Sequence, residues 1–151
     1  MYRTLSTQPE KASVVSRAEW GAVEHTGNKP IRHPIIYVFL TINSHAPRCA
    51  NKEECSRILR DMQDRDMKDG CTDIKYNFLI GDDGTIYEGR GWNFRPHHLD
   101  QFPSMDGQML DFACIGNFRK ELRPDAMYDA QWKLLNLGIE LKYLAKHAHY
   151  W

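Results

Sequence analysis

The sequence has no excess of charge of either sign. Its 151 residues include 20 Lys+Arg and 20 Asp+Glu, so the formal net charge is zero and the isoelectric point is near 7.0. A nucleic-acid groove needs a clustered excess of basic side chains, and so does a polybasic surface that binds an anionic membrane. The composition therefore argues against nucleic acid as a partner and against a polybasic membrane-binding surface.

Long hydrophobic runs are also missing. The longest apolar stretch, Pro34 to Ile42, has the length of a strand and falls far short of the ~20 residues that a membrane-spanning helix needs. The chain has no internal repeat or low-complexity segment, and its 42% hydrophobic and 26% charged residues exclude disorder over most of its length. We expect one domain with a buried core.

The N-terminus lacks the apolar stretch of a secretory signal. Met1 to Ala12 is polar, so we expect residues 1–13 to form a flexible leader and residues 14–151 to form the domain. Two interpretations stay open, an intracellular protein and a piece of a longer precursor.

Cysteine is scarce, and no Cys-x-x-Cys spacing suggests a zinc ribbon or a thioredoxin-type site. Of the four cysteines, Cys49 and Cys55 are separated by five residues, whereas Cys71 and Cys114 stand far apart. The short pair indicates a disulfide in a secreted domain and two buried thiols in a cytosolic one. Cys71 and Cys114 are compatible with ordinary core cysteines.

Hydrophobic periodicity predicts strands that alternate with helices. The apolar run from Ile35 to Ile42 predicts a strand buried on both faces. Asn51 is a good helix cap with Glu54 in the position of a capping-box acid, and the apolar residues that follow have helical spacing. The members of that helical stripe are Cys55, Ile58, Leu59 and Met62, with Asp66 as a further candidate.

The rest of the chain extends the pattern. Ser16 to Gly21 predicts a short helical turn, and the link Gly81-Asp82-Asp83-Gly84 predicts a hairpin. The expected remaining elements are strands at Lys75–Ile80, Thr85–Gly89 and Leu110–Phe118, and a long helix from Pro124 to about Lys146. Together they predict an α/β fold, a central mixed β-sheet flanked by helices.

Several segments, in this order, resemble peptidoglycan recognition proteins, which share the fold of phage-type N-acetylmuramoyl-L-alanine amidases. The resemblance runs from about residue 14 to about residue 145. The segments are Val15-Ser-Arg-Ala-Glu-Trp20-Gly21-Ala22, Tyr37-Val38, Cys49-x5-Cys55, Asp73-Ile-Lys-Tyr76-Asn77-Phe78-Leu79-Ile80-Gly81-Asp82-Asp83-Gly84, Tyr87-Glu88-Gly89-Arg90-Gly91-Trp92-Asn93 and Ile115-Gly116-Asn117-Phe118.

The resemblance implies a Cys49–Cys55 disulfide and hence an oxidising compartment. It implies an extracellular protein or a receptor ectodomain rather than a cytoplasmic one. It also implies an L-shaped groove for muropeptide on one face of the sheet. The groove candidates are Tyr76, Arg90, Trp92, Asn93, His98 and Cys71. For Arg90, Trp92 and Asn93, a role in bracing the hairpin is an equal alternative.

The chain departs from the family pattern at the metal positions. Catalytic members hold Zn²⁺ with two His and one Cys, and Thr41 stands in the slot of the first His. The other two ligands follow the long helix in the family, and we expect that region to begin beyond Trp151, in a fold that lacks the last helix. Tyr76 matches the catalytic tyrosine as a remnant. We therefore expect no metal, no cofactor and no enzymatic activity.

The remaining histidines are not spaced to rebuild a zinc site, which needs three or four converging ligands. His97 and His98 would point apart in an extended chain. The others considered are His45, His147 and His149, which we expect at the surface or in the groove.

The groove is altered as well. Cys71 stands where the family often has a Trp or Phe ring, and Asp66 stands where it often has a His. Losing a ring removes a main contact area, and Asp66 and Asp69 would repel the carboxylates of a muropeptide. We expect muropeptide binding to be weak or absent.

Three function hypotheses follow. The favoured one is a non-catalytic domain of innate immune recognition or regulation that acts through protein contacts, either with related peptidoglycan recognition receptors or by self-association. The second is a zinc-dependent amidase or a working muropeptide receptor. The third is an interaction module that reuses the fold.

Overall fold

The computed structural model describes residues 13–101 and 107–151. The expected leader, residues 1–13, lies outside the described residues except for Ser13, which is exposed. Within the described residues, none of the helices is both long and apolar enough to cross a membrane.

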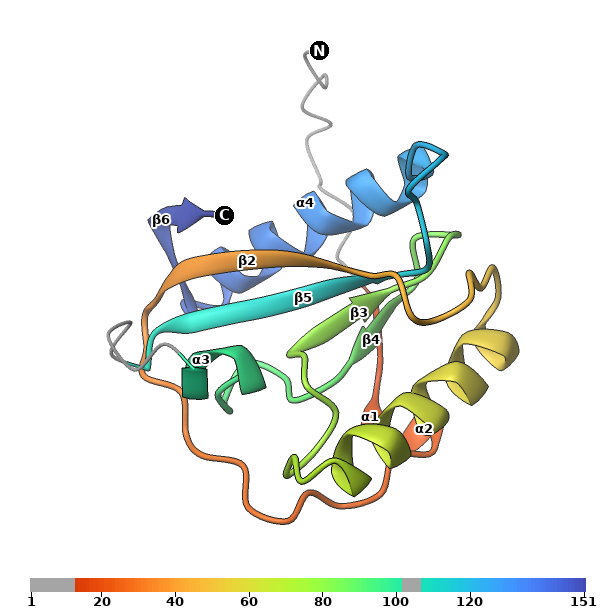
Figure 1. The fold of residues 1–151 in the computed structure, drawn as a ribbon. Helices are drawn as coiled ribbons and strands as arrows, with labels where there is room; N and C mark the ends of the chain where they lie inside the picture. Colours follow the sequence, from red (N-terminus) through yellow and green to blue (C-terminus); the bar gives the residue numbers. More distant parts are fainter. Residues whose placement is uncertain (1–12, 102–106) are drawn as a thin grey trace.

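The structure is a six-stranded mixed sheet with helices on both faces, which confirms the predicted α/β fold (Figure 1). The strand order is β1-β4-β3-β5-β2-β6; β3 and β4 run antiparallel, and the other neighbouring pairs run parallel. The elements are β1 (Val14–Val15), α1 (Arg17–Trp20), β2 (Ile35–Asn43), α2 (Lys52–Lys68), β3 (Phe78–Ile80), β4 (Ile86–Glu88), α3 (His97–Gln101), β5 (Met109–Ile115), α4 (Asp125–Glu140) and β6 (Leu144–Tyr150).

The two faces of the sheet bury different clusters, because alternate side chains of a strand point to opposite faces. Leu110, Phe112 and Cys114 of β5 pack with α4, whereas Ala113 and Ile115 pack with α1 and α2. Figure 1 shows α4 on one side of the sheet and α1 and α2 on the other. Asp111, next in the second series, therefore faces the α2 side.

Both predicted N-caps are confirmed. The Ser16 hydroxyl accepts a hydrogen bond from the Glu19 amide, and the Glu19 carboxylate accepts one from the Ser16 amide, which completes a capping box. At α2 the Asn51 side chain accepts a hydrogen bond from the Glu54 amide at 2.8 Å.

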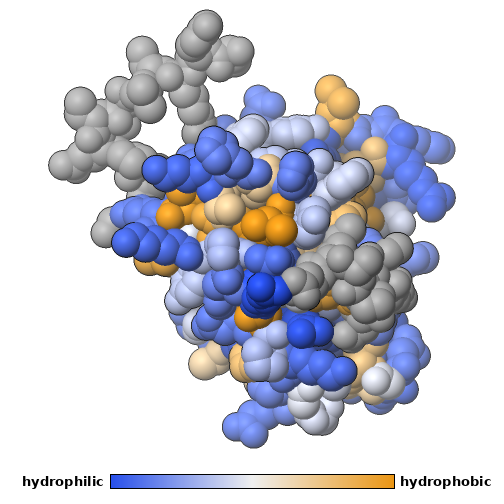
Figure 2. Space-filling view, turned by 90° about the vertical axis from the view of Figure 1, so that its left-hand side faces the viewer, coloured by the Kyte–Doolittle hydropathy of each residue, from blue (hydrophilic) through white to orange (hydrophobic). Residues whose placement is uncertain are grey.

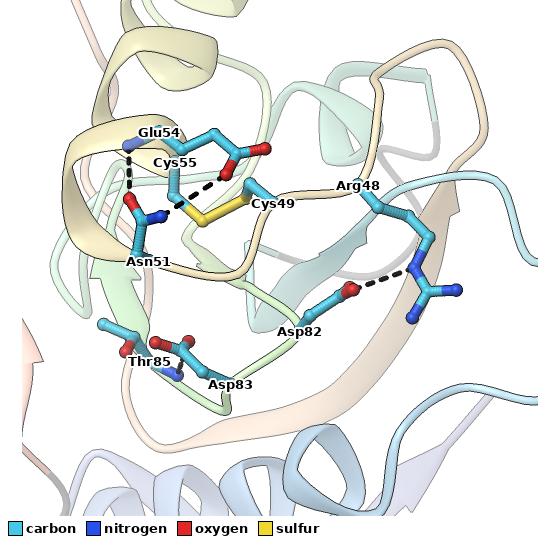
Figure 3. The surroundings of a disulfide bond; sticks show 8 residues. All are labelled: Arg48, Cys49, Asn51, Glu54, Cys55, Asp82, Asp83 and Thr85. Atoms are coloured by element: carbon cyan, nitrogen blue, oxygen red, sulfur yellow. Dashed lines mark hydrogen bonds and ion pairs between the residues drawn. A yellow bond between two sulfur atoms is a disulfide. The ribbon is translucent and has the colours of Figure 1, made fainter.

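A disulfide joins Cys49 and Cys55, as the resemblance implies (Figure 3). It connects the loop after β2 to the first turn of α2, beside the Asn51 cap. Arg48, next to the disulfide, forms an ion pair with Asp82 of the β3–β4 turn at 2.8 Å. The beginning of α2 is thus tied to both β2 and the hairpin.

The predicted strand boundaries were too wide, and one burial prediction was wrong. The hairpin strands cover Phe78–Ile80 and Ile86–Glu88, and β5 covers Met109–Ile115. In β2, Ile35 and Val38 are buried, but most other residues are half exposed. The reason is position: β2 is next to the edge of the sheet, and β6 pairs with only its first part.

The long helix does not continue to Lys146, as the sequence predicted; it ends at Glu140. The chain turns back through Lys142, which has a φ of 65°. The Tyr143 amide donates to the Gly138 carbonyl and the Lys142 amide donates to the Ile139 carbonyl, the hydrogen bonds of a Schellman motif. The usual sequence signal for this ending is Gly, and Lys stands in its place.

The segment after α4 then forms β6, parallel to β2, with Leu144 opposite Ile35 and His149 opposite Tyr37. These residues were expected in the last turns of the long helix and in the tail after it, and the structure has them in a strand instead. His147 and His149 belong to an edge strand and not to a tail.

Candidate functional site

A buried carboxylate lies at the centre of the α2 side of the sheet. Asp111 of β5 pairs in register with Phe39 of β2 and is 2% exposed. The Thr41 hydroxyl donates a hydrogen bond to Asp111 Oδ1 at 2.9 Å, and His98 Nδ1 lies 3.5 Å from Oδ2. The Asp111 amide donates to Asn77 Oδ1 at 2.9 Å, which ties β5 to the segment before β3.

Burial governs the proton affinity of this cluster. It raises the pKa of Asp111 to about 6, although the hydrogen bond from Thr41 and the neighbouring His98 act in the opposite direction. Burial also raises the pKa of Tyr76, and the carboxylates of Asp111 and Asp66 raise it further. The Tyr76 phenol therefore stays protonated at neutral pH and can donate a hydrogen bond.

Contrary to expectation, His97 and His98 begin α3 rather than lie in an extended chain, but their rings still have different neighbours. His97 Nδ1 lies 3.8 Å from the sulfur of Cys71, and the His98 ring packs against Phe39 at 5.0 Å between centroids. Burial raises the pKa of the Cys71 thiol, so it is not an activated nucleophile.

A hollow of about 400 Å³ opens beside Tyr76, between α2 and the end of β2. The Asp66 carboxylate borders it and accepts a hydrogen bond from the Lys75 amide at 3.1 Å. Burial raises the pKa of Asp66. The lining residues are Asn43, His45, Ala46, Met62, Arg65, Asp66, Asp69, Lys75 and Tyr76.

Comparison with known proteins identifies the family to which this site belongs. The family model described as N-acetylmuramoyl-L-alanine amidase matches residues 20–150. Peptidoglycan-recognition protein 1 of Holotrichia diomphalia is 36% identical over 140 residues, covering 89% of this chain and 66% of that protein. Peptidoglycan recognition protein 1 of Bos taurus is 31% identical over 141 residues, covering 93% of this chain and 73% of that protein.

The chain belongs to the peptidoglycan recognition protein family. Among solved structures, the ectodomain of the Drosophila transmembrane receptor PGRP-LCa aligns with a TM-score of 0.86 and 29% identity, over 91% of this chain and 83% of that one. Wild-type Drosophila PGRP-LB aligns with a TM-score of 0.84 and 32% identity, over 93% of this chain and 81% of that one. The sequence resemblance is thereby confirmed in both family and fold.

The donors present do not fit the zinc site of the catalytic peptidoglycan recognition proteins. Thr41 offers a neutral hydroxyl that already donates to Asp111. In β6, the His149 ring stacks on Tyr37 with 5.9 Å between centroids, and Tyr37 lies four positions before Thr41 on β2. Among the described residues, no three His, Cys, Asp or Glu side chains converge in a way that could hold a metal ion.

Two of the groove candidates have structural contacts in this peptidoglycan recognition protein domain. The buried Arg90 guanidinium donates to the carbonyls of Ile74 and Arg95 at 2.7 and 3.0 Å. Trp92 packs on the α4 side, stacked on Tyr143 and tilted against Phe78. These contacts match the bracing alternative for both residues.

The other groove candidates do not all lie together. The Asn93 side chain is exposed, and its carbonyl accepts a hydrogen bond from the Ile31 amide. Tyr76, His98 and Cys71 lie on the α2 side, Tyr76 at the hollow and His98 at Asp111. Sequence reasoning missed Asp111; the available signal was one acidic residue inside the apolar run Met109–Ile115.

Proposed function

We propose that this chain is a non-catalytic peptidoglycan recognition protein domain that acts in innate immune recognition or regulation. One observation carries the proposal: in the slot of the first zinc ligand stands Thr41, whose hydroxyl donates to the buried carboxylate of Asp111. A zinc amidase needs three protein ligands with the metal's fourth position open for water. A neutral hydroxyl that is hydrogen-bonded to a carboxylate is a poor zinc ligand, so Thr41 does not supply the first of these three ligands.

Zinc binding to the whole chain, measured by competition with a chromogenic chelator, tests the proposal. We expect no site with a dissociation constant below about 1 µM, since tight sites need three or four converging ligands. Stoichiometric zinc at higher affinity, lost in the Thr41→Val variant, would overturn it.

The groove supports weak muropeptide binding at most. Cys71 gives its wall no aromatic ring, and the loss of one such anchor commonly weakens binding tenfold or more. Calorimetric titration with tetrapeptide monomers of the Lys and diaminopimelate types measures this directly. Low-micromolar binding of either type would instead make the domain a working muropeptide receptor, the alternative that the 400 Å³ hollow favours.

The partner we propose is a second copy of this chain, bound at the apolar surface between α4 and the free part of β2, here called the α4 trough. Six large hydrophobic residues line it while remaining exposed: Ile42, Leu122, Tyr128, Trp132, Tyr150 and Trp151. Figure 2 shows the end of the molecule that carries β6, where hydrophobic residues lie among hydrophilic ones. Exposed apolar surface of this kind marks an association site.

Charge favours self-pairing over other partners. The net charge is zero, so two copies do not repel each other. Lys120 precedes α4 and Glu140 ends it, so two α4 helices packed antiparallel bring these opposite charges together. Binding of a related peptidoglycan recognition receptor in place of self-association is the other outcome of a sedimentation test.

An oxidising compartment fits this function. The Cys49–Cys55 disulfide is typical of secreted proteins and ectodomains. The similar PGRP-LCa structure is the ectodomain of a transmembrane receptor. We therefore place this domain outside the cell, as a secreted protein or as part of a receptor.

A further inference from the structure

The edge strand β6 carries a pair of histidines, His147 and His149, that the proposed function does not use. β6 stands last in the strand order, so it has a neighbouring strand, β2, on one side only. Both histidines are exposed. Within residues 13–101 and 107–151, neither imidazole ring has a hydrogen bond or an ion pair. The ring nitrogens of both side chains therefore remain available to a ligand.

The two imidazoles lie on the same face of the strand. Successive side chains of a strand point to opposite faces, so every second residue shares a face. The β6 residues that pack on the α4 side are Leu144, Ala148 and Tyr150. His147 and His149 belong to the other series and face the α2 side. Lys146 belongs to the α4 series, so its charge points away from the pair.

The spacing of the pair suits a single metal ion. Two residues along a strand lie about 6.5 Å apart, and an imidazole nitrogen binds a metal ion at about 2.0 Å. Two rings that lean toward each other can therefore bind one ion between them. The His149 ring stacks on Tyr37 with 5.9 Å between centroids, which orients it, whereas His147 has no ring contact in the described part of the chain and is free to turn toward it.

The other five of the seven histidines do not form such a pair. Four have contacts of their own: the amides of Gly27 and Asn28 for His25, the Trp92 carbonyl for His33, the Cys71 sulfur for His97 and the Asp111 carboxylate for His98. The fifth, His45, has no second histidine near it in the sequence. Exposure, a shared face and unpaired ring nitrogens occur together only in β6.

From this arrangement we propose that His147 and His149 chelate a divalent transition-metal ion, with Cu²⁺ preferred. Imidazole is a good ligand for Cu²⁺, Ni²⁺ and Zn²⁺, and a given set of nitrogen ligands binds Cu²⁺ most tightly of the three. Water completes the coordination, because no third His, Cys, Asp or Glu among the described residues converges with the pair. Zn²⁺, which needs three or four protein ligands for tight binding, binds this pair more weakly.

Copper titration of the whole chain tests the proposal. Calorimetry at neutral pH, with glycine as a competing chelator, should give one Cu²⁺ per chain, bound more tightly than Ni²⁺ or Zn²⁺. Electron paramagnetic resonance of the bound ion should show imidazole nitrogen ligands. The absence of a stoichiometric copper site would overturn the proposal.

Variants of β6 assign the ligands. His147→Asn and His149→Asn should each weaken Cu²⁺ binding at least tenfold, since even the loss of a group that only supports a metal ligand commonly costs that much. Lys146→His combined with His147→Lys exchanges two neighbours, keeps the composition and moves one imidazole to the other face, so it should lose as much. Lys146→Gln is the matched control and should stay within about twofold of the parent. Copper retained in His147→Asn combined with His149→Asn would refute the assignment.

Paramagnetic broadening locates the ion without any substitution. Substoichiometric Cu²⁺ should broaden the amide NMR signals of Tyr37, His147 and Ala148 first. Broadening centred on His98 and Asp111 would place copper elsewhere and rule out the β6 site.

The result is separable from that of the proposed function. Zinc-dependent amidase turnover would refute the non-catalytic proposal and leave the copper assignment unchanged. Copper that does not depend on the two β6 histidines would refute this site alone.

Discussion

Asp111 is the residue that distinguishes the α2 side of the sheet. It carries a carboxylate into a strand whose other side chains are apolar and buried, and it takes the hydroxyl of Thr41 as its hydrogen-bond donor. The hydroxyl of Thr41 is thus already hydrogen-bonded to a protein side chain. The same carboxylate contributes to the raised pKa of Tyr76, which keeps the phenol protonated.

The raised pKa of Asp111 gives a pH-dependent stability with a definite sign. Burial disfavours the ionised form in the folded state, so the folded protein holds this proton up to about pH 6, whereas the unfolded chain releases it near 3.8. Stability from this group is therefore highest below pH 4 and falls as the pH rises from about 4 through 6, by about 2–3 kcal/mol. The Asp111→Asn variant keeps an acceptor for Thr41 and removes the titration.

We therefore expect the free energy of unfolding of Asp111→Asn, relative to the parent, to be about 2 kcal/mol higher at pH 7 than at pH 4. Urea denaturation at the two pH values measures it. Asp64→Asn, on the exposed face of α2, should show a much smaller change. A difference for Asp111→Asn that is the same at both pH values would contradict the prediction.

Single residues were predictable from the sequence where a local motif or the family pattern fixed them. Thr41 and Cys71 stood out because they occupy family positions. Asp111 did not, since no motif marks it and its partners, Thr41 and His98, come from β2 and α3. Only the register of three elements brings them together.

At the scale of elements, the end of α4 carries the clearest departure from the sequence prediction. Helical periodicity continues through Leu141 and Leu144, yet the Schellman hydrogen bonds end the helix at Glu140. Leu144 is buried all the same, from β6 against the same core. Leu144 can be buried either as part of a longer helix or as part of β6, so hydrophobic periodicity could not distinguish a helix from a strand here. Helix α2 and the hairpin were predictable because caps and turn glycines marked their ends.

Lys142 holds a left-handed backbone conformation, with φ at 65°, that glycine adopts without steric cost. Lys142→Gly should therefore raise the free energy of unfolding by about 0.5–1 kcal/mol, after the greater freedom of glycine in the unfolded chain is included. Asn136→Gly, exposed inside the same helix, should lower it by a few tenths of a kcal/mol. Urea midpoints of the two variants measure both effects; destabilisation by Lys142→Gly would show that this turn carries no strain.

For the whole molecule, two surfaces lie on opposite faces of the sheet. The α2 face carries the Asp111 cluster and the charged hollow, and the α4 face carries the trough. The sequence predicted the layers, because the hydrophobic pattern and the family pattern determine them. It could not predict the trough's outline, which depends on where β6 stops along β2.

The trough predicts a self-association that one charge disrupts. Sedimentation velocity over a range of concentrations should show a monomer–dimer equilibrium, and Trp132→Glu, which adds a carboxylate to the exposed apolar surface, should shift it toward monomer by at least tenfold in dissociation constant. Val23→Glu, at an exposed site outside the trough, is the control. A parent that stays monomeric alone but binds a related receptor through the trough would assign the surface to that partner instead.

Turnover of muropeptide directly measures whether this domain has amidase activity, and we expect none. The chain is incubated with a muramoyl-tetrapeptide and excess Zn²⁺, and release of the stem peptide is followed by mass spectrometry, with a catalytic relative as positive control and EDTA as the check on metal dependence. We expect no release above the no-enzyme blank, because Thr41, at the position of the first zinc ligand, has a neutral hydroxyl that is hydrogen-bonded to Asp111. Release that zinc sustains and EDTA abolishes would contradict it.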